Sequence, residues 1–388
     1  MLKINQRKSY LKLFLLIGFI LSASNALIAY VNSSYLGQFF GAKNIGWIFI
    51  ISYFVSLVVI NNFPSIINRL KIFLASLSVL SLMFLGLMGF GLAISPWAAA
   101  VFFVIYTVCL NLIWISLDIY IEYFSSESRT GRIRGLYWTL VNIAWFLAPV
   151  TAGWLLSRFN YPFLFYLSDF LLLIVLILFY FKFHHLEVDH FPKVYFWDAL
   201  KKIWTNKLLN GIFAIAFVLQ LFYCFMVIFT PIYLHDIIGF DWPQIGIMFS
   251  AALFNFVYMT YPAGWLADKF IGEKELLSVG LLIMGIFTII FGLISGHNFW
   301  LWLIVLFMTR VGASLVDIMK DTYFFKRVEV HDVELINLFR NTGPLAYVIG
   351  SALALLAVYF LSYQYLFVFT GLLILSMLYF SFTLKDTK

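Results

Sequence analysis

The residue best suited to binding chemistry is Arg310, because it stands inside a long apolar stretch of the sequence. It lies about eleven residues into that stretch, which at a rise of about 1.5 Å per residue is close to the middle of a bilayer. An arginine at that depth needs a partner or a wet cavity, and its guanidinium can hold a carboxylate or a phosphate through two hydrogen bonds. We interpret Arg310 as an anchor for an anionic solute. The alternative is a structural ion pair, with Asp169 or Asp317 as the partner.

Other polar side chains recur at spacings of four and seven residues within apolar stretches, which places them on single helix faces. They gather in the first, fourth, seventh and tenth stretches, and Asp169 lies in the sixth. Asp118, Asp169 and Asp317 are candidates for taking up protons, and ion pairing is the other interpretation of these carboxylates. The predicted substrate and ion pathway comprises Asn25, Asn111, Asp118, Asp169, Gln220, Tyr223, Arg310, Ser314 and Asp317.

The composition is that of an integral membrane protein. Of the 388 residues, 63% are hydrophobic and 11% are charged, whereas soluble domains contain about 25% charged residues. The mean hydropathy is +0.98. The net charge of +7 comes from basic residues at the ends of apolar stretches, so nucleic-acid binding is not expected. Cys109 and Cys224 both lie within apolar segments and are interpreted as buried thiols.

Twelve apolar runs approach the length of about 20 residues that a membrane-spanning helix needs. The sequence therefore predicts an all-α membrane protein with 12 transmembrane helices in two six-helix bundles, 1–183 and 208–388. The polar linker 184–207 separates them, and its end predicts an amphipathic helix on the membrane surface. The runs begin near Leu11, Ile45, Ile72, Trp97, Leu136, Pro162, Leu208, Pro243, Leu276, Phe299, Leu338 and Tyr363.

The basic residues predict the orientation of these helices. Lys43 and Arg158 are the only ones at one set of helix ends, Arg310 lies within a helix, and all others fall at the opposite ends. Because lysine and arginine accumulate on the cytoplasmic side, we expect both termini in the cytoplasm and the protein in the cell (cytoplasmic or inner) membrane.

A tight polar turn between two apolar runs carries a motif. Gly264 and Gly272 flank the pair Asp268 and Lys269, and a related turn containing Asn68-Arg69 occupies the corresponding place in the first half. The turn resembles the signature loop of the major facilitator superfamily, Gly-x-Leu-x-Asp-Arg/Lys-x-Gly-Arg/Lys. The resemblance implies that this loop latches the cytoplasmic side and that helices one, four, seven and ten line the cavity. The expected cytoplasmic gate comprises Gly264, Asp268, Lys269, Gly272, Asn68, Arg69, Glu122, Arg129, Arg132, Arg134, Asp321 and Arg340.

The fifth helix carries small residues at a second family-like spacing. They resemble the antiporter motif of the superfamily, with alanine at three of its glycine positions, and Pro149 bends the helix. Ordinary close packing of two membrane helices is the alternative interpretation. The motif positions are Gly135, Ala144, Ala148, Pro149, Ala152 and Gly153.

Together the resemblances imply a secondary transporter working by alternating access, most similar to drug:proton antiporters. The predicted function is proton-coupled export of a small organic solute by a monomer in the bilayer. The absence of a carboxylate from helix one and the presence of Asn111 in helix four weigh against proton antiport. One alternative is uptake of an anionic metabolite or sugar anchored by Arg310, and another is a membrane-embedded receptor. No enzyme motif, cofactor site or metal site is expected, although His184, His185 and His190 lie close together.

Overall fold

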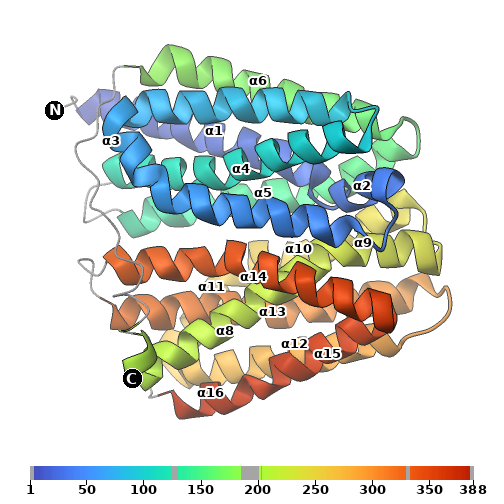
Figure 1. Cartoon of the computed structure of the whole chain (residues 1–388). Coiled ribbons are helices and arrows are strands. Elements are labelled where there is room, and N and C mark those ends of the chain that lie inside the picture. Colours follow the sequence, from blue (N-terminus) through green and yellow to red (C-terminus); the bar gives the residue numbers. More distant parts are fainter. Residues whose placement is uncertain (1–3, 125–129, 185–200, 202, 329–332, 385–388) are drawn as a thin grey trace. The chain divides into compact units, whose positions relative to one another are not determined.

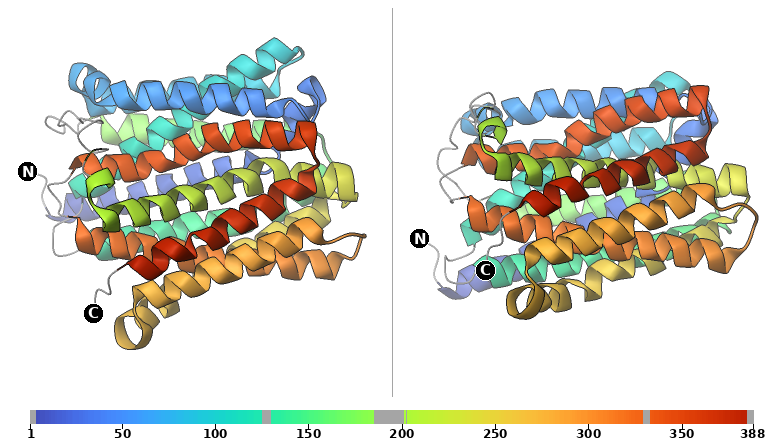
Figure 2. Two further views of the ribbon diagram at one scale, coloured as in Figure 1. Left: turned by 60° about the horizontal axis from the view of Figure 1, so that its bottom comes forward. Right: turned by 90° about the horizontal axis from the view of Figure 1, so that it is seen from below.

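A computed structural model describes residues 4–124, 130–184, 201, 203–328 and 333–384 of the chain. All regular secondary structure in these residues is helical (Figure 1). The chain forms two compact units, Met1–Lys193 and Val194–Lys388. The helices of each unit run alongside one another as a bundle (Figure 2).

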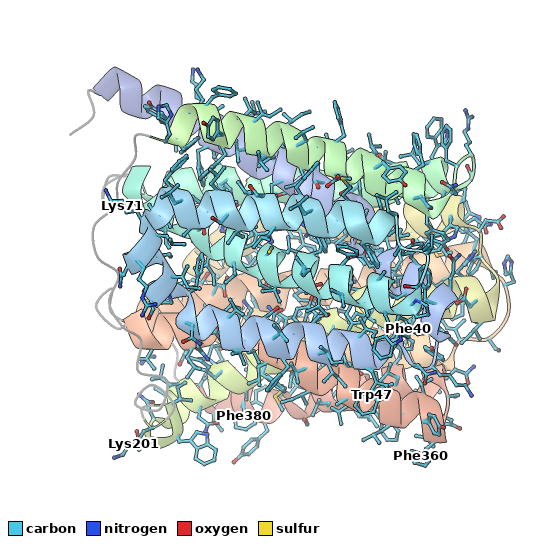
Figure 3. The ribbon with its side chains drawn as sticks, turned by 45° about the horizontal axis from the view of Figure 1, so that its top comes forward. Phe40, Trp47, Lys71, Lys201, Phe360 and Phe380 are labelled. Atoms are coloured by element: carbon cyan, nitrogen blue, oxygen red, sulfur yellow. The ribbon has the colours of Figure 1, made fainter. Side chains whose placement is uncertain are left out.

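In the first unit, α1 packs against α5 and α6, while α3 packs against α4 and α6. The backbone of α3 leaves the helical conformation at Lys71, where φ is 65°, so that two limbs meet at this residue. Figure 3 shows Lys71 at the opposite end of the first limb from Trp47. The helices are α1 (Ile4–Ala29), α2 (Asn32–Phe40), α3 (Ile45–Gly91), α4 (Pro96–Phe124), α5 (Thr130–Leu156) and α6 (Tyr161–Phe183).

In the second unit, α12 packs against α13 and α15, α10 packs against α13, and α8 packs against α14. Two π-helical segments, Phe225–Phe229 and Tyr233–Ile238, surround Pro231, which lacks the N–H that a regular α-helix needs. The helices are α8 (Lys207–Cys224), α9 (Thr230–Ile232), α10 (Trp242–Tyr258), α11 (Thr260–Leu266), α12 (Glu273–Leu293), α13 (Phe299–Arg327), α14 (Val333–Phe360), α15 (Tyr363–Ser376) and α16 (Leu378–Thr383).

The described helices confirm the predicted fold class. By length and composition, 10 of them can cross a membrane, or 11 if the bent pair Trp242–Tyr258 and Pro262–Ile271 is one span. In that count α3 is a single span, although its 47 residues would extend about 70 Å as one helix. Because a bilayer core is only about 30 Å thick, the two limbs that meet at Lys71 are each long enough to cross it. Counting the two limbs separately, with the bent pair as one span, gives the predicted twelve.

Candidate functional site

Arg310 is buried in α13, with 1% of its surface exposed. None of its three guanidinium nitrogens has a hydrogen-bond partner among the described residues. Its guanidinium carbon instead lies 5.0 Å from the ring centroid of Phe222 and 5.8 Å from that of Tyr223, both in α8. Such contacts favour the positive charge but use the ring faces, whereas the five N–H donors of a guanidinium point outward in its plane. Arg310 therefore makes cation–π contacts with two aromatic rings, while its hydrogen-bond donors have no described acceptor.

Two neighbouring helices hold α13 where it presents Arg310 to α8. A Cβ added at Gly312 would lie 2.4 Å from the backbone nitrogen of Met284, so α12 and α13 touch through their backbones. On another side, the Asn255 amide of α10 donates to the Phe307 carbonyl across 3.4 Å. Asn255 is itself fully buried and also donates to its own helix. These contacts fix the rotation and depth of α13.

Asp317, one of the predicted alternative partners of Arg310, belongs to another charge cluster two turns further along α13. Lys320 Nζ lies 3.0 Å from Asp317 Oδ1 and 2.5 Å from Asp321 Oδ1, and it faces the Phe339 ring at 5.4 Å. Lys320 is only 5% exposed, so the two carboxylates compensate a buried charge. The sequence prediction treated this lysine only as a sign of orientation and did not identify its pairing.

A second ion pair joins the start of α12 to the end of α13. Lys326 donates to the carboxylate of Glu273, which is buried although its partner is partly exposed. Glu273 was not among the predicted gate residues. The charges of the two residues and their distance in sequence gave no sign that they would meet, because the close approach of α12 and α13 depends on glycines.

The described contacts of Gln220 and Ser314 do not include Arg310. The Gln220 side-chain oxygen lies 3.6 Å from where a Cβ of Gly343 would be, at the contact of α8 with α14. The Ser314 hydroxyl is buried and donates to the Val311 carbonyl of its own helix at 2.9 Å. Of the predicted pathway residues in this unit, the structure thus brings Tyr223 to Arg310.

In the first unit, the polar pathway residues connect α1, α3 and α4. The Tyr106 hydroxyl donates to Asn25 Oδ1 at 3.0 Å, and the Asn111 amide donates to Ser56 Oγ at 3.3 Å. Tyr106 was missed in the sequence analysis, because a tyrosine in an aromatic-rich helix gives no particular signal.

The remaining two pathway carboxylates lie on different helices of the same unit. Asp118 of α4 is half-buried and close enough to the Tyr137 phenol of α5 to interact with it electrostatically. Asp169 of α6 is 6% exposed, and its Oδ1 has no hydrogen-bond partner among the described residues. No described contact brings these two carboxylates together.

The predicted gate is described only in part. Gly272 has φ 99°, a conformation that favours glycine and ends the turn before α12, and Lys269 stacks over the Trp265 ring at 5.4 Å. Asn68 and Arg69 are exposed on α3. The gate role remains a prediction, as does the amphipathic surface helix, because 185–200 are outside the described residues. The side chains of Glu122, Arg129, Arg132, Arg134, Asp268 and Arg340 also lie outside the described part of the chain.

The small residues of α5 share a buried face. Ala144, Ala148 and Ala152, spaced by four, are 2%, 4% and 4% exposed, and α5 packs against α1. Pro149 and Gly153 are buried beside them, whereas Gly135 is exposed. A Cβ added at Gly18 of α1 would meet the ring of Tyr137 at 2.4 Å, so the two helices approach closely. This geometry accommodates both the antiporter interpretation and ordinary packing.

The residues described include no group of three or more histidine, cysteine or acidic side chains arranged to hold a metal ion. His185 and His190 lie outside them.

The fold and the buried polar groups define a polytopic helical membrane protein with a charged site among its spanning helices. The sequence matches the family model of the Major Facilitator Superfamily over residues 14–258 and 222–388. The chain belongs to this superfamily and is a membrane transporter. Comparison with curated proteins gives no match.

Two solved structures have the same fold. One is a POT family transporter in complex with 5-aminolevulinic acid, with a TM-score of 0.77, 11% identity, and coverage of 96% of this chain and 95% of that chain. The other is a POT family transporter in complex with a thioalcohol conjugated peptide, with a TM-score of 0.76, 11% identity and the same coverage. At this identity the likeness concerns the fold alone.

Proposed function

We propose that the protein is a secondary transporter that moves a small organic anion across the cell membrane by alternating access, with Arg310 as the residue that binds the anion. The observation that carries this proposal is the buried guanidinium without a hydrogen-bond partner among the described residues. A buried charge normally has a partner, because leaving its hydrogen-bond donors without acceptors costs free energy. A solute with a carboxylate or a phosphate would supply the missing acceptor.

The surroundings of Arg310 favour an acceptor with two oxygens side by side. Phe222 and Tyr223 occupy the space above the guanidinium, so an incoming group reaches the N–H donors along the edge. A carboxylate or a phosphate accepts two parallel hydrogen bonds in that geometry. The structural ion pair has less support, since Asp317 already lies 3.0 Å from Lys320. Pairing with Asp169 is the other interpretation of Arg310.

A stability screen tests this assignment directly. The melting temperature of the purified protein is measured with organic carboxylates and phosphates, each beside its neutral amide or alcohol analogue. Because one similar structure contains 5-aminolevulinic acid, this compound belongs in the set. A ligand at about one hundred times its Kd stabilises a protein by about 2.7 kcal/mol.

Wild-type protein and Arg310→Gln are compared, with Arg158→Gln as the control because Arg158 is exposed and lies over Trp154. We expect one or more anions to stabilise the wild type and the control but not Arg310→Gln. Neutral analogues that work equally well, or an undiminished response of Arg310→Gln, would overturn the assignment.

For the energy source and the direction of transport, we propose proton-coupled export. We also propose that both termini lie in the cytoplasm and that the monomer is the working unit. The buried small-residue face of α5 supports export through its likeness to the antiporter motif. Uptake of the same anion is the second candidate, and the unpaired Arg310 supports both directions. Flux in proteoliposomes with an imposed pH gradient separates them. Export by antiport predicts solute movement against the proton flow, and uptake by symport predicts movement with it.

A further inference from the structure

Asp169 presents a second isolated charge, and it lies in the first unit on the inner face of α6. One turn earlier, Phe165 is fully buried against the Tyr35 and Phe90 rings. Leu172, three residues later, is also fully buried. Within the described residues, Oδ1 of this carboxylate has no hydrogen-bond partner. The transport site assigned to Arg310 does not account for it.

Hydrogen bonds join α1 and α6 immediately beside Asp169. Ser24 Oγ of α1 donates to the Ser168 carbonyl of α6 at 2.8 Å, and Ser168 Oγ donates back to the Ser24 carbonyl at 2.7 Å. The next residue on each helix is Asn25 and Asp169, respectively. This reciprocal pair holds the amide of Asn25 and the carboxyl of Asp169 at the same level of the bundle.

A third helix contributes a phenol. The Tyr106 hydroxyl of α4 donates to Asn25 Oδ1 at 3.0 Å and is close enough to Asp169 to interact with it electrostatically. Tyr53 of α3 interacts with Tyr106 in the same way. Asp169 of α6 thus lies near the Tyr106–Asn25 hydrogen bond, which joins α4 to α1 within the same unit.

No basic side chain in the described part of this unit is paired with Asp169. Lys12 in α1 lies thirteen residues before Asn25, a distance of about 20 Å along the helix. Arg69 and Lys71 lie at the kink of α3, and Arg158, beyond the end of α5, is exposed over a tryptophan ring. The Tyr106 phenol interacts electrostatically with the carboxyl, and Tyr53 in turn interacts with Tyr106.

We propose that the Asp169 carboxyl is the site that binds the coupling proton, an inference that rests on the proposed transport function. One proton forms an O–H bond with the carboxylate, which becomes a neutral carboxylic acid, and the same proton leaves to water on the other side of the membrane. A proton suits this site better than a metal cation. A metal cation requires several ligands, and the described residues include no group of three or more acidic, histidine or cysteine side chains arranged to hold one.

The first test observes the acid group itself and needs no solute. Infrared spectra of the purified protein in lipid are recorded from mildly acidic to mildly alkaline pH, with Asp169→Asn as the variant. A carboxylic-acid C=O band that disappears as the pH rises is expected in the wild type, and the variant should lack it. Asp241→Asn is the matched control, because Asp241 is exposed and asparagine replaces it well as a helix N-cap.

A second variant, Asp169→Glu, is needed in case Asp169→Asn does not fold. Asp169→Glu keeps a carboxyl and should therefore keep a titrating band. A wild-type spectrum that Asp169→Asn leaves unchanged would overturn the proposal. A band that is removed by sodium at constant pH would also overturn it, in favour of a cation site.

A second test links the site to transport. With an anion found in the stability screen, Asp169→Asn should still exchange solute between equal concentrations but lose accumulation driven by a pH gradient. Gradient-driven accumulation that persists in Asp169→Asn would contradict the proposal. If no solute is found but the infrared band behaves as expected, the anion assignment of Arg310 fails while the proton site stands. If the band is missing while Arg310-dependent binding is found, the proton site alone fails.

Discussion

Replacing Arg310 with methionine should stabilise the protein when no solute is present. A buried charged group with unmade hydrogen bonds costs about 3 kcal/mol, and the guanidinium of Arg310 has no described partner. The contact of its guanidinium with the Phe222 ring at 5.0 Å stabilises the folded protein by about 2 kcal/mol. Methionine has no donors to satisfy and makes a sulfur–aromatic contact worth about 0.3–1.5 kcal/mol. The net expectation is a gain of about 1.3–2.5 kcal/mol in the free energy of unfolding.

The matched control is Lys320→Met, which removes another buried cation from the same helix. Lys320 has two carboxylate partners, at 3.0 Å and 2.5 Å, so its removal should destabilise the protein. The loss should be smaller than the about 3–5 kcal/mol of a fully buried broken pair, because the two carboxylates are 35% and 51% exposed.

Both variants are unfolded with denaturant in the same lipid environment without added solute. Opposite signs of the change are the predicted result. A loss of stability in Arg310→Met as large as that in Lys320→Met would mean that Arg310 is a structural ion-pair residue, and the anion site would have to be abandoned.

Three further comparisons test the packing that supports the sites. Gly312→Ala should destabilise the protein by about 1–3 kcal/mol in denaturant unfolding, because the added Cβ meets the backbone of α12, while Gly264→Ala, with no atom within 4 Å, should not. In the α12–α13 ion pair, Lys326→Met should lower the melting temperature more than Glu273→Gln does, since the acid is 2% exposed and the lysine 44%; equal effects would argue against a buried carboxylate. Ser168→Ala removes the donor of one α1–α6 hydrogen bond and should cost about 0.5–1.5 kcal/mol in the same unfolding assay, and an unchanged stability would argue against the reciprocal pair.

The membrane-spanning helices could be predicted from the sequence because each needs a long apolar run, a property of a local segment. The predicted starts at Ile45, Phe299 and Tyr363 coincide with helix starts in the structure. The two limbs of α3 were also predicted, since separate runs begin at Ile45 and Ile72. Their meeting at Lys71 was not, because a positive φ at a lysine has no sequence signature.

The candidate sites could be predicted only as far as single residues reveal them. Arg310 was identified because a charge within an apolar run is conspicuous, but whether it has a partner depends on the rotation of α13 against α8. For Lys320 the sequence was misleading. Its position near a helix end suggested a signal of membrane orientation, whereas in the structure it is buried and paired with a carboxylate. The sequence did not single out Phe222 or Tyr106, because the chain contains many aromatic residues.

The most direct test of the account is the flux of an anionic solute, taken from the stability screen, into proteoliposomes that contain the wild type or Arg310→Gln. Loss of a charged hydrogen-bonding residue from the binding site removes about 3 kcal/mol, or about a hundredfold in affinity. We predict saturable flux in the wild type and a loss of about that size in flux at low solute concentration for the variant. Equal flux through both proteins, or no flux of any stabilising anion through the wild type, would contradict the central claim.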